Sequence, residues 1–149
     1  MRFKADTWPR WLIDVVSDIA HCIILMHGIS ERPTTTVLIV DDEVPVRNLV
    51  VKILRKAAYE VLTAGTAEEA LEILKVKHVD VVLTDHHLPD GDGATLAKDI
   101  LARWPNVKTA LCSGGGRPVS APSDLRYLAK PFSIEELLSF IESLRNAQP

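Results

Sequence analysis

The hydrophobic positions of this chain follow two alternating spacings from residue 37 onward. Short apolar runs rich in β-branched residues, typical of strands in a buried sheet, recur at Val37–Val40, Glu60–Ala64, Val79–Thr84, Val107–Cys112 and Tyr127–Ala129. Between them, spacing of three and four residues predicts amphipathic helices, whose apolar positions include Val46, Leu49, Ala70, Leu96 and Ile134. Strands that alternate with helices predict a parallel sheet covered on both faces. Since such crossovers are right-handed, we expect a doubly wound α/β fold with a five-stranded parallel sheet.

Local signals place the starts of three of these helices. Pro45 suits the first turn of the first helix. Thr66 with Glu69, and Ser133 with Glu136, each match a capping box, in which the two side chains bond reciprocally to backbone N–H groups. These signals agree with the hydrophobic spacing that follows them.

The alternation breaks between Ser113 and Lys130. This segment contains Gly114, Gly115 and Gly116 in succession, and Pro118 and Pro122 follow. Both residue types are unfavourable inside a helix. We therefore expect a short, mobile loop or at most one helical turn there, so that the fourth helix of the fold is short or missing.

The first 33 residues differ in character from the rest, so we divide the chain into an N-terminal extension (1–33) and a main domain (34–149). The run from Trp11 to Met26 is strongly apolar but contains Asp14 and Asp18, and carboxylates at the centre of a membrane span are costly. We therefore expect no membrane span, and the broken run also fits a signal peptide poorly. Three interpretations stay open: a helix that packs on the domain or on a second copy, a membrane-surface contact, or a segment without a role if translation starts at Met26.

Composition narrows the class of protein. The chain has 149 residues and a formal net charge of −3, which argues against direct nucleic-acid binding through a general basic field. Cys22 and Cys112 are too few for a disulfide framework, and their surroundings lack the Cys and His spacing of a zinc site. We expect Cys112 to be a buried small side chain. A reducing cytoplasm is the simplest location.

Polar side chains with complementary chemistry follow four of the five predicted strands. Asp41 and Asp42 follow the first strand, Asp85 the third, Ser113 the fourth and Lys130 the fifth. The carboxyl ends of parallel strands share one edge of the sheet, where ligands bind in this class of fold. Clustered carboxylates repel one another and need a cation, and oxygen ligands suit Mg²⁺. A carboxylate in this setting can attack phosphorus, with the ammonium and hydroxyl groups binding phosphoryl oxygens.

The set of motifs resembles the receiver domain of two-component response regulators over residues 36–146. The resemblance rests on Asp41-Asp42, the segment from Asp85 to Gly93, Ser113-Gly114 and Lys130-Pro131-Phe132, in this order and each at a strand end. It implies a flavodoxin-like strand order of 2-1-3-4-5 and identifies Asp85 as the phosphoacceptor. It also implies that Mg²⁺ is held by Asp42, Asp85 and the backbone carbonyl of His87, with Asp41 acting through a metal-bound water.

The resemblance assigns the other site residues too. Ser113 would bind the phosphoryl group, Lys130 would pair with it, and Tyr127 matches the switch aromatic that rotates inward on phosphorylation. The glycine-rich segment is similar to a subgroup of stand-alone receivers with a degenerate fourth helix. We expect His86 and His87, as neighbours, to point in different directions, which disfavours a transition-metal site.

The function implied is that of a single-domain response regulator, not a conventional enzyme, with no output domain after the last helix. A sensor histidine kinase or phosphotransfer protein would donate the phosphoryl group. An unknown downstream protein would read the result, or the chain would serve as a phosphate shuttle or sink; pairing of two copies stays open. The alternative is a receiver-like interaction module that works without phosphorylation. A Mg²⁺-dependent phosphohydrolase is disfavoured because His87 stands where a second acidic residue would be needed.

Overall fold

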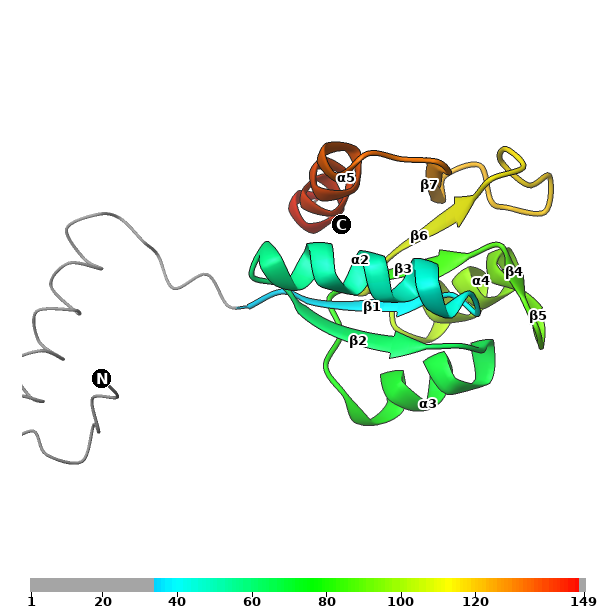
Figure 1. The fold of residues 1–149 in the computed structure, drawn as a ribbon. Coiled ribbons are helices and arrows are strands. Elements are labelled where there is room, and N and C mark those ends of the chain that lie inside the picture. Colours follow the sequence, from blue (N-terminus) through cyan, green and yellow to red (C-terminus); the bar gives the residue numbers. More distant parts are fainter. Residues whose placement is uncertain (1–33, 148–149) are drawn as a thin grey trace, which may run out of the picture. The chain divides into compact units, whose positions relative to one another are not determined.

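The computed structural model describes residues 34–147, and their central feature is a five-stranded parallel sheet (Figure 1). Its strands, in the spatial order β2-β1-β3-β6-β7, are β2 (Glu60–Ala64), β1 (Thr36–Val40), β3 (Val81–Asp85), β6 (Lys108–Ser113) and β7 (Arg126–Ala129). Counted along the chain, these are the second, first, third, fourth and fifth strands of the sheet. The predicted fold class and strand order are therefore confirmed. The extension predicted over residues 1–33 lies outside the described residues.

Within the described residues, four helices cover the sheet: α2 (Val44–Lys56), α3 (Ala67–Val76), α4 (Gly93–Arg103) and α5 (Ile134–Asn146). Successive strand residues face opposite sides, so Val37 and Ile39 pack with α2 and α5. Leu38 and Val40 pack with α3 and α4 on the other side. This two-sided burial explains why β1 and β3 are continuous apolar runs in the sequence.

The segment between β6 and β7 contains no helix, as the glycines and prolines predicted. We call residues 114–125 the β6–β7 loop. Leu125, at its end, is 4% exposed and joins Ala121 and Tyr127 in a small apolar cluster against Leu111 and Ala97. The loop thus covers, with a few side chains, part of the face that a helix would otherwise cover.

The helix starts follow the predicted signals with one correction. Ser133 and Glu136 form a complete capping box at α5, and Pro45 lies in the first turn of α2. At α3, Thr66 Oγ1 accepts from the Glu69 N–H at 3.1 Å, but the Glu69 carboxylate accepts from Gly65 N–H rather than from Thr66. The prediction that the Glu69 side chain bonds back to the Thr66 N–H is therefore wrong.

A carboxylate from another part of the chain completes the cap of α3. Asp90 accepts the backbone N–H groups of Ala67 and Glu68, both at 2.9 Å. These two hydrogen bonds lower the pKa of the Asp90 carboxyl. The first turn of α3 therefore depends on a residue more than twenty positions later, which local sequence rules do not find.

Two further features differ from the sequence pattern. Leu49, which matches the helical spacing of α2, is 60% exposed because Val50 and Leu54 face the sheet and Leu49 lies about 100° around the helix from Val50. Two short strands, β4 (His87–Leu88) and β5 (Gly91–Asp92), form an antiparallel hairpin that is too short to leave a periodic signal.

Within residues 34–147, no helix is long and apolar enough to cross a membrane, and the run from Trp11 to Met26 is outside that range.

Candidate functional site

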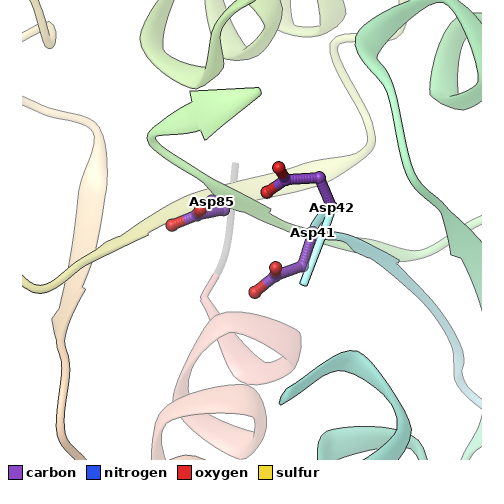
Figure 2. A group of neighbouring side chains, drawn as sticks. All are labelled: Asp41, Asp42 and Asp85. Carbon is purple, nitrogen blue, oxygen red and sulfur yellow. The ribbon is translucent and has the colours of Figure 1, made fainter. Parts of the chain in front are cut away.

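Three carboxylates meet at the carboxyl end of the sheet. Asp41 and Asp42 directly follow β1, and Asp85 is the last residue of its neighbour, β3. Each contributes an oxygen atom to a group whose members all lie within 4.8 Å of one another (Figure 2). The predicted convergence of these residues, far apart in the chain, is present in the structure.

Lys130 reaches the same point from the end of β7. Its Nζ lies 3.0 Å from Asp41 Oδ2 and 3.3 Å from Asp85 Oδ1. Its backbone N–H donates to the carbonyl of Ser113, which holds the start of the next segment against β6. Asp41 is 5% exposed and Asp85 9% exposed, so both ion pairs lie where water screens them little.

Burial and charge act in opposite directions on these groups. Burial raises the pKa of the Asp85 carboxyl and the charge of Asp41 adds to this effect, while Lys130 opposes it. Burial alone would lower the pKa of Lys130, but its hydrogen bond to Asp41 and the charges of both carboxylates outweigh that and raise it. With three carboxylates and one ammonium, the site retains an excess of negative charge.

The donor set fits a hard divalent cation such as Mg²⁺. All three converging groups offer carboxylate oxygens, and Asp42 is exposed on the solvent side. Both oxygens of Asp41 already accept hydrogen bonds, Oδ1 from the Glu43 N–H at 2.8 Å and Oδ2 from Lys130. Asp42 and Asp85 are therefore better suited to bind a cation directly than Asp41 is.

Ser113 is the last residue of β6, and Tyr127, in the adjacent strand β7, reaches it through its side chain. Ser113 is 3% exposed, and its Oγ accepts from the Gly115 N–H at 3.3 Å. The Tyr127 hydroxyl donates to the Ser113 carbonyl oxygen at 3.0 Å, and its ring packs in the cluster with Leu111. The Tyr127 side chain is thus already bonded to Ser113 in this structure. His87 is exposed at the start of β4, and the role of its carbonyl stays a prediction.

The two histidines after Asp85 lie closer together than expected. Their ring centroids are 4.4 Å apart, so the expectation that they point in different directions is wrong. The tight β4–β5 hairpin, which the sequence pattern did not reveal, bends the chain at this point. Among the described residues, the three aspartates are the only group of three or more side chains arranged to hold a metal, and neither histidine belongs to it.

Cys112 lies beside the site within β6, paired in register with Asp85. It is 3% exposed, which confirms the prediction of a buried side chain. Burial raises the pKa of its thiol to about 12, with the charges of Asp85 and Asp41 adding to the effect and Lys130 opposing it. The thiol is therefore a packing group at neutral pH rather than a nucleophile.

Asp92 and Gly93 also support the site, although no role was predicted for either residue. Asp92 is the N-cap of α4, and its Oδ1 accepts from the Ala94 N–H at 2.9 Å. A Cβ atom built on Gly93 would lie 1.9 Å from the carbonyl oxygen of Asp85, so only glycine fits there. The available signal was an Asp-Gly pair a few residues before the helical spacing that includes Leu96.

Comparison with known proteins agrees with this geometry. The family model of the response regulator receiver domain matches residues 37–142. The receiver protein CpdR of Brucella abortus is 32% identical over 113 residues, covering 72% of this chain and 94% of CpdR. The sensor kinase CckA of the same organism is 34% identical over 122 residues, covering 77% of this chain but only 13% of CckA.

A solved structure supports the same assignment. The response regulator TrrA of Thermotoga maritima, solved in complex with Mg²⁺ and BeF, shares 29% identity with a TM-score of 0.66, covering 74% of this chain and 99% of TrrA. The five-stranded fold, the carboxylates at the ends of β1 and β3, and these matches all agree. The chain therefore belongs to the response regulator receiver domain family.

Proposed function

We propose that this chain is a single-domain response regulator that accepts a phosphoryl group on Asp85 from a phosphohistidine of a sensor kinase or phosphotransfer protein. The observation that carries the proposal is the convergence of Asp41, Asp42 and Asp85 within 4.8 Å, with the Lys130 ammonium beside two of them. Receiver domains are signalling modules rather than conventional enzymes, so the product of the reaction is the modified protein itself.

The chemistry assigned to Asp85 is a substitution at phosphorus. One Asp85 carboxylate oxygen attacks the phosphorus atom and forms a P–O bond, while the P–N bond to the donor histidine breaks. The electron pair of that bond leaves with the imidazole nitrogen, which takes up a proton. The product is an acyl phosphate, and the contribution of the protein is placement and charge compensation.

Asp42 and Asp85, together with the carbonyl of His87, would hold Mg²⁺, and Asp41 would act through a bound water. The bound ion would compensate the negative charge that gathers between carboxylates and phosphoryl oxygens. Both oxygens of Asp41 already accept a hydrogen bond, which supports its indirect role. The TrrA structure, described as a complex with Mg²⁺ and BeF, supports the choice of ion.

The remaining residues would receive and report the phosphoryl group. Lys130 would exchange part of its contact with Asp85 for a phosphoryl oxygen, and Ser113 Oγ would donate to another. Tyr127 would follow Ser113, because its hydroxyl is bonded to the Ser113 carbonyl. These shifts would change the affinity for a downstream protein.

The single-domain form of the proposal is supported by CpdR, since the matched segment covers 94% of that protein. The same segment covers only 13% of CckA, so a receiver of this kind also occurs inside a longer protein. The cognate partner is proposed only as a class, a histidine kinase or phosphotransfer protein.

The test is incubation with acetyl phosphate and Mg²⁺, followed by intact-mass measurement. We expect the wild-type chain to gain the mass of one phosphoryl group and Asp85→Ala to gain none. Asp124→Ala, which changes an exposed acid of the β6–β7 loop, is the matched control and should be modified like the wild type. Failure of the wild type with acetyl phosphate and with phosphorylated kinases would overturn the proposal and favour an interaction module that works without phosphorylation.

A further inference from the structure

The β6–β7 loop is braced by bonds of its own. The Ala121 N–H donates to the Pro118 carbonyl and the Leu125 N–H to the Pro122 carbonyl, both at 3.1 Å. The Arg117 guanidinium also donates to the carbonyl of Pro122. Residues 117–125 therefore form a small body with internal hydrogen bonds, separated from Ser113 by three glycines that transmit little of its movement.

The Asp92 carboxylate ties this body to the start of α4 by a hydrogen bond, beside the apolar packing of Ala121 and Leu125 on Ala97. The Ser120 hydroxyl donates to Asp92 Oδ2 at 3.1 Å. The other oxygen, Oδ1, accepts from the Ala94 N–H at 2.9 Å and lies 2.8 Å from Nδ1 of His86. Asp92 thus contacts the loop, the start of α4 and the residue that follows Asp85.

There is no free space between Asp92-Gly93 and the end of β3. A Cβ atom added to Gly93 would lie only 1.9 Å from the carbonyl oxygen of Asp85. The Gly93 N–H donates to the His86 carbonyl at 2.8 Å, and the His86 N–H donates to the Cys112 carbonyl at 3.0 Å. A shift of the backbone at Asp85 must therefore displace residues 92 and 93 as well.

The contact between His86 and Asp92 is close but is not a hydrogen bond. The buried Nδ1 of His86 makes no hydrogen bond, although Asp92 Oδ1 lies only 2.8 Å away. A small rotation would complete the bond, and a buried polar atom gains from such a partner.

From these contacts we infer that the Asp92 carboxylate is the link through which a change at Asp85 reaches the β6–β7 loop. The inference rests on the proposed phosphorylation of Asp85. The moving surface is the outer part of the loop, where Val119 is fully exposed. Tyr127 is bonded to Ser113 through its hydroxyl, so it follows Ser113 and not Asp92.

The experiment compares Ser120→Ala with Ser123→Ala in the full chain. Both serines are exposed residues of the same loop, but only Ser120 bonds to Asp92. Amide hydrogen exchange is measured at Ala121 and Leu125, first without phosphoryl donor. We expect exchange to be about fivefold faster in Ser120→Ala and unchanged in Ser123→Ala. Equal exchange in the two variants would overturn the link whether or not Asp85 is phosphorylated.

The second arm adds acetyl phosphate and Mg²⁺. We expect exchange in the loop to change in the wild type and in Ser123→Ala, and to stay constant in Ser120→Ala although its phosphoryl mass gain is normal. A loop response in Ser120→Ala equal to that of the wild type would overturn the inference. If no chain gains phosphoryl mass, the proposed function fails and with it the dependence on Asp85, while the first arm still decides whether Asp92 holds the loop.

Discussion

The two margins of the site are built differently. On one side, β1 and β3 are buried over all five of their residues and have helices on both faces. On the other side, β7 has only exposed and half-buried residues, and the β6–β7 loop takes the place of a helix. Both margins supply functional groups, Asp41 and Asp85 from the first and Lys130 from the second.

The densely packed strands hold the functional groups in position, whereas the loop side is able to change when the protein is modified. Carboxylates that must converge within a few ångströms need a rigid support, and dense two-sided packing provides it. A surface that changes on modification needs an element of low local stability, and a loop with three glycines and few buried side chains is such an element. The following variants test this contrast, beginning with the largest expected effect.

The first prediction concerns the tight contact behind Asp85. Gly93→Ala places a Cβ atom 1.9 Å from a backbone oxygen, so we expect a loss of more than about 4 kcal/mol in the free energy of unfolding, or no folded protein. Gly91→Ala is the matched control, because nothing lies within 4 Å of its added Cβ. Urea unfolding measures both. A Gly93→Ala protein as stable as Gly91→Ala would show that the β3 end is not rigid.

The second prediction compares the same substitution, leucine to alanine, in β1 and in the β6–β7 loop. Leu38 in β1 is fully buried, and Leu125 at the end of the loop is 4% exposed. We expect Leu38→Ala to cost about 4 kcal/mol and Leu125→Ala about 2 kcal/mol, since a loop can collapse into the space and a central strand cannot. Thermal and urea unfolding of the two variants decide this. Equal costs would mean that the loop is packed as firmly as the sheet.

Whether a contact in this structure could be predicted from the sequence depends on how far apart its residues are in the chain and on whether regular strands or helices connect them. The meeting of Asp41 and Asp85 was predictable, because parallel strands bring their carboxyl ends to one edge whatever the intervening helices do. The missing helix was predictable from glycine and proline alone. The cap of α3 by Asp90 and the bond from Ser120 to Asp92 were not, since they join residues more than twenty positions apart through irregular backbone.

The close approach of the His86 and His87 rings was mispredicted for a related reason. Alternation of side chains holds along a regular strand, but β3 ends at Asp85 and a two-residue hairpin follows. Local sequence rules therefore served well inside regular elements and failed in the turn where the site is completed.

The smallest expected effect concerns the cost of keeping Asp85 charged on the rigid side. Burial raises the pKa of Asp85 in the folded protein above its ordinary value of 3.8, so the folded state holds this proton more tightly than the unfolded chain does. Stability from this group is therefore greatest at low pH and falls as the pH rises from about 3.8 through the folded-state value. Asp85→Asn removes that loss.

We therefore expect Asp85→Asn to be more stable than the wild type at pH 7 without Mg²⁺, by less than about 1 kcal/mol because Lys130 already offsets part of the charge. The gain should shrink as the pH is lowered from the folded-state pKa of Asp85 toward 3.8, and also when Mg²⁺ is added to the wild type. Asp124→Asn, in the exposed loop, is the matched control for the change of charge. Chemical unfolding between pH 3 and pH 8 makes the comparison. An Asp85→Asn variant that is less stable than the wild type at pH 7 would contradict this prediction. It would mean that the attraction between Asp85 and Lys130 exceeds the cost of burying the Asp85 charge, so that the charged site stabilises the fold.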